Sequence, residues 1–474
     1  METKPKDKYN LVYFFFVCLG LSHLLAYHCF VVAYDYFAPH LKSISKNFEF
    51  WFNSLLNCTA CIALSFDLFF TTYLKRKRLK KGITKPKKLR YTFRIISGFV
   101  TYVICLSTPS IIIQFFPVKL AFALLMIEVT LIGCATGIVE GGIFGFAALF
   151  EPKYTTALMI GQGVAGALMV YLRIITKATT KETVAGVRKS AISYFASSSG
   201  IVACVIFAYF FILKNKFTKY YVDKYYQTHY HKNQNQKEIK EVENEIIIES
   251  DTRSEEYLQK EENSPLTDHK DLLINESESG SEDIEKKTLL SNTEFKDGKE
   301  KDIKLFDLYK RCFPYSISVF LSFTVTIAIY PAVIVEIPST SSYLTSSGWF
   351  GIILLTAFNT IDLVGRSLPM WYPNLLSIKA ITWTVCLRFV FCVYFVLCIK
   401  KIIFIDWLAI ILMIVFAITN GFPSSTAMMR GPFDPKIKDH ERDTVAIILT
   451  ISVQAGLFAG AVSSWIFVPV IKHS

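Results

Sequence analysis

The feature that most constrains this chain is a series of long apolar runs, separated by short polar segments. A run of about 20 apolar residues is long enough to cross the hydrocarbon core of a bilayer, which is roughly 30 Å thick. Only 19% of the residues are charged, against about 25% in soluble domains. The sequence therefore predicts an all-α integral membrane protein and excludes a water-soluble globular fold.

We expect about eleven transmembrane helices, in an arrangement of six followed by five. The predicted spans cover residues 11–35, 50–74, 93–116, 119–149, 154–176, 188–213, 314–336, 347–369, 378–399, 404–429 and 443–471. A polar segment separates the sixth span from the seventh. It is rich in Glu, Lys, Asn and Ser, so it cannot bury enough apolar surface to fold alone. We therefore predict a six-helix bundle over residues 1–213, a disordered cytoplasmic linker over 214–312, and a five-helix bundle over 313–474.

The orientation follows from the basic segment 75–90, KRKRLKKGITKPKKLR, which contains ten Lys or Arg residues and no acidic residue. The positive-inside rule places this segment in the cytoplasm, together with the basic N-terminus and the linker. The C-terminus is then outside. The net charge of +12 thus reflects membrane topology, and we expect no nucleic-acid partner. We expect the plasma membrane, with an endolysosomal membrane as the alternative, because Leu272-Leu273 and Leu289-Leu290 follow acidic residues as in sorting signals.

Small residues recur every four positions on two of the predicted spans. On the fourth span they are glycines, and on the last they are serines and glycines. This spacing puts them on one helix face, where the missing side chains let two backbones approach closely. The predicted packing positions are Gly137, Gly141, Gly145, Gly161, Gly456 and Gly460.

Ionisable residues inside a membrane cost about 2.5–3.5 kcal/mol each and usually face a bundle interior or an aqueous cavity. Asn359, Asp362 and Arg366 are spaced three and four residues apart, so they share one helix face. Asp362 and Arg366 can neutralise each other. Two interpretations remain open: a polar face that lines a substrate path, and a buried ion pair that fixes helix packing.

Glu140 lies beside the glycine face of the fourth span. It could accept hydrogen bonds from a substrate, bind and release a proton, or pair with an arginine on a neighbouring helix. The histidines of the first span, His23 and His28, are more typical of hydrogen-bonded packing residues. We expect Asp67 to reach water near the end of the second span, and Arg388 to be structural.

No sequence signature of an enzyme is present. The chain lacks a Walker A motif, a GxSxG motif and an HExxH motif. Its eleven cysteines are scattered, nearly all of them within apolar runs, without the paired spacings of a zinc site. We therefore expect no enzymatic activity, no cofactor and no metal, and a transport process driven by gradients.

Five segments resemble one known family, the equilibrative nucleoside transporters. They are LGLSHLLAYHCF (19–30), the stretch 137–178 that begins GIVEGGIFGFAALFEP, IYPAVIVEI (329–337), FNTIDLVGRSL (358–368) and ITNGFPSSTAMMRGP (418–432). The resemblance implies an eleven-helix fold of the major-facilitator kind, split six plus five, with alternating access around one central site.

The resemblance also implies a substrate site for a nucleoside or nucleobase. Carried over motif by motif, its residues are Leu24, Tyr27, Glu140, Tyr330, Asn359, Asp362 and Arg366. In this site the base would stack on the two tyrosines, and Asp362 with Arg366 would hold the ribose.

The chain departs from the family pattern at three places. Ala26, Tyr27 and His28 replace Pro-Trp-Asn, Glu140 replaces Gln, and Tyr330 replaces Phe. These changes leave the substrate range open. The leading hypothesis is a facilitative nucleoside carrier. A proton-coupled nucleoside or nucleobase symporter is the alternative, and a non-transporting receptor or scaffold is the third hypothesis.

Overall fold

A computed structural model describes residues 5–45, 47–80, 90–179, 184–224, 305–346, 348–403, 405–438 and 441–469. Every regular element within these ranges is a helix. The described residues up to 224 and those from Arg311 onward belong to one compact unit. A second unit contains, of the described residues, only 305–310. The predicted all-α fold is confirmed.

The described residues contain 11 helical segments that are long and apolar enough to cross a membrane. The first six are formed by α1 (Leu11–Val32), α3 (Phe48–Lys80), α4 and α5 (Arg90–Ser107 and Pro109–Phe115), α6 (Val118–Ala147), α7 (Pro152–Thr179) and α8 (Val184–Leu213). The last five are formed by α11 (Leu305–Ile329), α13 (Trp349–Trp371), α14 and α15 (Ile378–Leu387 and Phe389–Ile399), α16 (Asp406–Arg430) and α17 (Arg442–Ser464). The predicted arrangement of six plus five spans is confirmed.

Three of the predicted spans are interrupted. The third divides into α4 and α5 at Pro109, which has no backbone N–H to continue the helix. The seventh ends its α-helix at Ile329, ahead of Pro331 and the short helix η2 (Ile334–Glu336). The ninth divides at Arg388, whose backbone N–H donates to the carbonyl of Val385, 3.2 Å away, in a tighter turn.

Several helices extend into segments that we expected to be loop or linker. Helix α3 continues to Lys80, into the basic segment, because lysine, arginine and leucine are strong helix formers. Residues 216–224 are helical, and α11 begins at Leu305. Short helices α2 (Tyr34–Leu41) and α12 (Ser342–Ser346) connect spans. Residues 81–89 of the basic segment and the linker residues 225–304, with both leucine pairs, lie outside the described residues.

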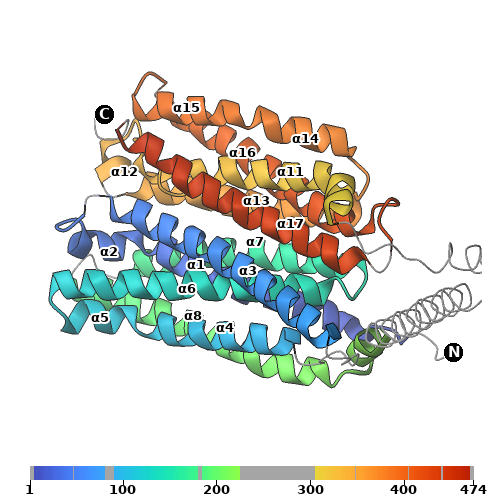
Figure 1. Ribbon diagram of the computed structural model, residues 1–474. Coiled ribbons are helices and arrows are strands. Elements are labelled where there is room, and N and C mark those ends of the chain that lie inside the picture. The colour runs from blue at the N-terminus through green and yellow to red at the C-terminus, as the bar shows by residue number, and fades with distance from the viewer. Residues whose placement is uncertain are drawn as a thin grey trace, which may run out of the picture. The chain divides into compact units, whose positions relative to one another are not determined.

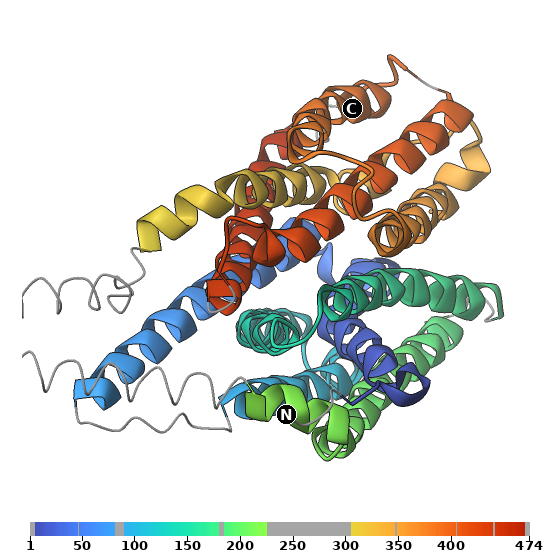
Figure 2. The same cartoon turned by 90° about the vertical axis from the view of Figure 1, so that its right-hand side faces the viewer.

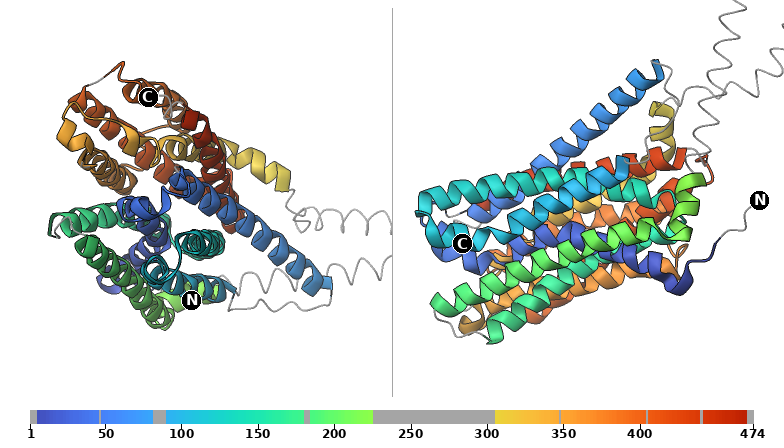
Figure 3. Two further views of the ribbon diagram at one scale, coloured as in Figure 1. Left: turned by 90° about the vertical axis from the view of Figure 1, so that its left-hand side faces the viewer. Right: turned by 90° about the horizontal axis from the view of Figure 1, so that it is seen from below.

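The spans pack in two groups. In Figures 1 and 2 the helices of residues 8–213, coloured blue to green, lie on one side, and those of residues 311–469, yellow to red, lie on the other. Within the first group α1 packs on α7, and α3 and α4 pack on α6; within the second, α13 packs on α16. Four main pairs join the groups: α7 packs on α13 and α16, and α17 packs on α3 and α6. Figure 3 shows α3 (blue) and α17 (red) side by side.

The predicted packing glycines of α6 lie at close helix contacts. A Cβ atom at Gly137 would collide with the backbone of Ala60 on α3. At Gly141 it would lie 2.8 Å from the side chain of Leu64, also on α3. Gly145 lies one turn further on and faces α4. The missing side chains therefore let α6 approach both neighbours.

The other three predicted glycines serve two further contacts. Gly161 on α7 faces the backbone of Val17 on α1. Gly456 and Gly460 on α17 face the backbone of α11. These contacts hold together the helices that surround the centre of the protein.

Candidate functional site

A polar cavity lies between the two groups of helices, with about 780 Å³ of empty space. Helices α1, α3, α6 and α7 line it from the first group, and α11, α13, α16 and α17 from the second. The cavity is lined by all seven residues that the sequence predicts for the site: Leu24, Tyr27, Glu140, Tyr330, Asn359, Asp362 and Arg366.

Helix α13 supplies the charged part of this lining. Asp362 and Arg366 are one helical turn apart and 5% exposed each. The Nε of Arg366 donates to Oδ2 of Asp362 at 2.6 Å. The amide of Asn420 on α16 donates to the other oxygen, Oδ1, at 2.8 Å. The carboxylate is therefore held at both of its oxygens.

A chain of polar contacts connects Arg366 to the first group of helices. Its Nη1 donates to Oε1 of Gln162 on α7, at 3.3 Å. The amide nitrogen of Gln162 lies 3.2 Å from Nδ1 of His23 on α1. His28, one turn further along α1, also lines the cavity. Both histidines thus contribute to the polar wall rather than only to helix packing.

Glu140 on α6 is 2% exposed. It accepts a hydrogen bond from the side-chain amide of Gln454, on α17. The partner on the neighbouring helix is therefore a neutral amide, where the sequence left open an arginine. Because α6 and α17 belong to different groups, this bond also crosses between the two halves.

The two tyrosines that line the cavity differ in the contacts that they make. The ring of Tyr330 stacks on Phe358 with 4.5 Å between centroids and an interplanar angle of 26°. Its hydroxyl accepts a hydrogen bond from Asn359 at 2.9 Å. A base could therefore stack only on the other face of Tyr330. The hydroxyl of Tyr27 donates to Oδ1 of Asn53 at 3.4 Å.

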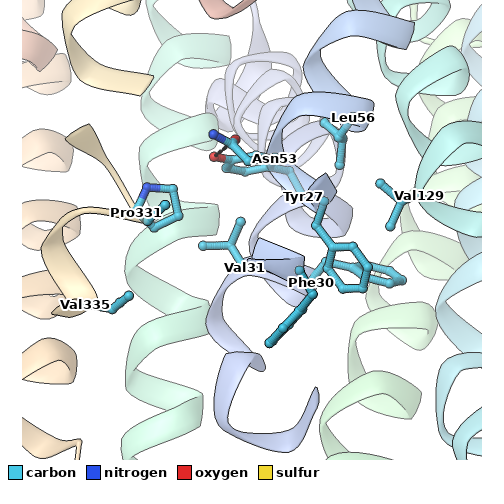
Figure 4. A pocket seen from close by; sticks show the side chains of 11 residues that line it. Tyr27, Phe30, Val31, Asn53, Leu56, Val129, Pro331 and Val335 are labelled. Carbon is cyan, nitrogen blue, oxygen red and sulfur yellow. Dashed lines mark hydrogen bonds between the residues drawn. The ribbon is translucent and has the colours of Figure 1, made fainter. Parts of the chain in front are cut away.

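A second, largely apolar cavity adjoins the polar one, with about 500 Å³ of empty space. Figure 4 shows Tyr27 and Phe30 on one side of it, with Pro331 and Val335 across from them. Tyr27 lines both cavities. Its side chain therefore stands between the polar centre and the apolar space near the end of α1.

The sequence analysis missed four amides that line the polar cavity: Asn57, Gln162, Asn420 and Gln454. Neutral amides within apolar runs attract less attention than charges do, yet a polar group without a partner is costly in a membrane. Because of that cost, an amide inside an apolar run predicts a hydrogen-bond partner or a polar cavity, and this signal could have identified these residues.

Two other intramembrane carboxylates lie outside the lining of this cavity. Glu128, on α6, was not singled out from the sequence, and it accepts a hydrogen bond from Thr108. Asp67 does not simply reach water as expected: it is ion-paired with Arg94, whose Nε lies 3.2 Å from Oδ1. Arg94 is itself buried and was not singled out either.

Comparison with known proteins identifies the family to which this sequence is similar. The sequence model of one family, described as nucleoside transporter, matches residues 126–469. The chain belongs to the nucleoside transporter family. The resemblance seen in the five motifs is thereby confirmed, and the chain is a membrane transporter rather than a receptor or scaffold.

The relatives match along nearly the whole chain. Human equilibrative nucleoside transporter 1 is 25% identical over 504 aligned residues, which cover 98% of each chain. Mouse equilibrative nucleoside transporter 2 is 25% identical over 487, with the same coverage. Equilibrative nucleotide transporter 1 of Arabidopsis thaliana is 25% identical over 474, covering 98% of this chain and 88% of the relative. A solved proton:xylose symporter of the major facilitator superfamily aligns with a TM-score of 0.47 and 12% identity, over 98% of this chain and 88% of that one.

Proposed function

We propose that this chain carries nucleosides across a membrane down their concentration gradient, and that the polar cavity is the substrate site. The observation that supports this most is the held carboxylate of Asp362, which shares one cavity with Arg366 and the aromatic ring of Tyr330. A nucleoside presents the matching chemistry: ribose hydroxyls and a flat base. The cavity lies between two groups of helices, as alternating access requires.

The ribose would bind at the ion pair. A carboxylate has about four lone-pair sites, and Arg366 and Asn420 occupy one on each oxygen of Asp362. The remaining sites can accept hydrogen bonds from two hydroxyls. Arg366 has donors beyond the two that it gives to Asp362 and Gln162, and these can donate to the same hydroxyls.

The base would lie toward the aromatic and amide side of the cavity. Tyr330 offers one ring face, and Tyr27 lines the polar cavity where it borders the apolar one. Both rings provide the stacking that every base accepts. Glu140 and Gln454 supply an acceptor and a donor for the polar edge of a base.

Alternating access would then use contacts at the two ends of the bundle. At the end where α3 begins, Trp465 donates to Ser54 at 2.7 Å and packs on Trp51 with 5.0 Å between ring centroids. At the opposite end, the hydroxyl of Tyr13 lies 3.2 Å from the sulfur of Met370. We propose that these contacts between the halves open in turn as the halves rock around the cavity.

The proposed orientation follows the positive-inside rule. The N-terminus and the linker are cytoplasmic and the C-terminus is outside, in the plasma membrane. In this orientation the Trp465 contact lies at the outer end. Glu140 acts as a hydrogen-bond acceptor and not as a proton carrier, since its partner in the structure is a donor amide.

Uptake of labelled adenosine into cells that lack their own nucleoside carriers tests this function. Cells that express the chain should accumulate adenosine only to the external concentration, and excess unlabelled uridine or adenine should report whether pyrimidines or free bases compete. Cells that express Asp362→Asn at equal surface level should show only background uptake. Adenosine uptake no greater than in untransfected cells would refute the proposal.

A further inference from the structure

Arg388 is a buried charge that the proposed site does not use. It is 1% exposed and lies where α14 meets α15, and its side chain does not line the cavity. Its guanidinium sits over the ring of Phe416, 4.5 Å from the ring centroid. Burying an arginine away from water is costly unless its N–H groups donate hydrogen bonds to specific acceptors.

Two residues one turn apart on α11 supply the closest acceptors, and the backbone carbonyl of Phe416 on α16 is a further one, 3.4 Å from Nη2. Nη1 of Arg388 donates to the hydroxyl of Ser322 at 2.9 Å and to the backbone carbonyl of the same residue at 2.7 Å. Nη2 donates to the hydroxyl of Thr326 at 2.8 Å. The planar guanidinium group thus donates to both hydroxyl oxygens at the same time.

Each hydroxyl has a single proton to give. Because both oxygens already accept from Arg388, their protons are free for other acceptors: the proton of Ser322 can go to Asn420, and the proton of Thr326 to Asn420 or to the backbone carbonyl of Ser322, 2.7 Å away. Oδ1 of Asn420 lies 2.7 Å from Thr326 Oγ1 and 3.2 Å from Ser322 Oγ. The amide oxygen therefore has two hydroxyls within hydrogen-bond distance; Thr326 also lines the cavity, whereas Ser322 does not.

This arrangement fixes which way the amide of Asn420 faces. With its oxygen held by two hydroxyls, its NH2 group points to Oδ1 of Asp362, 2.8 Å away. The reversed amide would place an oxygen against the carboxylate, and two acceptors repel. The orientation that Arg388 enforces is the one that supports Asp362.

We propose that Arg388 is a positioning residue for the substrate site. Through Ser322 and Thr326 it orients Asn420, and Asn420 holds the carboxylate of Asp362 in the direction in which it accepts the ribose hydroxyls. Arg388 touches no substrate itself. The inference rests on the proposed function, because it assigns Asp362 to the ribose.

The test compares adenosine with 2′,3′-dideoxyadenosine, which keeps the base and lacks both ribose hydroxyls of interest. The measured quantity is the ratio of their uptake efficiencies, Vmax/KM. Arg388→Lys should lower the adenosine efficiency about tenfold, the factor expected for one weakened hydrogen bond to a charged group, and change the dideoxy efficiency little. Ser322→Ala removes one hydroxyl of the relay at a residue that does not line the cavity, and it should lower the same ratio, so the test stands even if Arg388→Lys does not fold.

Two further variants complete the design. Arg94→Lys alters another buried arginine, ion-paired with Asp67 outside the cavity, and should leave the ratio unchanged. In the double variant Arg388→Lys/Ser322→Ala the loss should be no larger than the larger single loss, since both act through Asn420.

The outcomes separate the relay from the function on which it depends. If Asp362→Asn lowers the ratio while Arg388→Lys and Ser322→Ala reduce both efficiencies equally, Arg388 only supports the fold and the proposal is overturned. If the unmodified protein takes up neither compound, the proposed function fails and the relay fails with it. A selective loss in both variants, with Arg94→Lys unchanged, supports the relay.

Discussion

The ion pair of Asp362 and Arg366 gives the sharpest mutational prediction. Both side chains are 5% exposed, and 2.6 Å separates their bonded atoms. Removing one partner of a buried pair leaves an uncompensated charge, at a cost of about 3–5 kcal/mol. Each of Asp362→Ala and Arg366→Ala should therefore abolish adenosine uptake, and each should lower the thermal stability of the purified protein. Uptake assays and thermal unfolding in detergent measure the two effects separately.

The double variant Asp362→Asn/Arg366→Gln separates substrate binding from packing. It removes both charges together and nearly keeps the volume, so no charge remains unpaired in the bundle. We expect a folded protein with a melting temperature close to the original and with uptake at background level. The matching change at the buried pair outside the cavity, Asp67→Asn/Arg94→Gln, should keep most of the uptake.

A double variant with full transport would refute this reasoning. Asp362 and Arg366 would then form an ion pair that only fixes helix packing, which is the second interpretation that the sequence left open. Loss of uptake in both double variants, with normal folding, would also count against a specific role for the cavity pair.

Three other changes have distinct expected results. Glu140→Gln should keep uptake and shift selectivity among bases, with flat, identical profiles against external pH in both proteins; a pH response that disappears in the variant would instead show proton coupling. Deleting residues 235–300 should leave near-normal uptake, because their composition offers little apolar surface to pack; complete loss in a correctly delivered protein would contradict this. Gly161→Ala should destabilise the protein by about 1–3 kcal/mol, since its Cβ would strike the backbone of Val17, whereas Gly200→Ala, with open space around it, should not; equal melting temperatures would refute the packing argument.

Much of the fold could be predicted because lipid leaves few alternatives. Apolar length alone gave the spans, since only helices or closed barrels satisfy the backbone in a bilayer. The three-and-four spacing of Asn359, Asp362 and Arg366 predicted a shared face, and the structure places all three on one cavity wall. These inferences need only distances along one helix.

The rest of the site depends on neighbours across helices, which one sequence does not display. Nothing in the spacing says that Asn420 bonds to Asp362, or that Arg388 reaches Ser322 and Thr326. Gln454 is likewise far from Glu140 in the chain and becomes its partner only when α6 and α17 pack together. The interruption at Arg388 had no proline to predict it.

Transport of a nucleoside by the purified chain is the most direct test of this account. The protein is reconstituted into liposomes loaded with unlabelled adenosine, and labelled adenosine is added outside with no ion gradient and no ATP. The account predicts a transient accumulation of label above equilibrium, driven by exchange, that is absent with Asp362→Asn and in protein-free liposomes. Label that enters no faster than into protein-free liposomes, or only when a proton gradient is imposed, would contradict it.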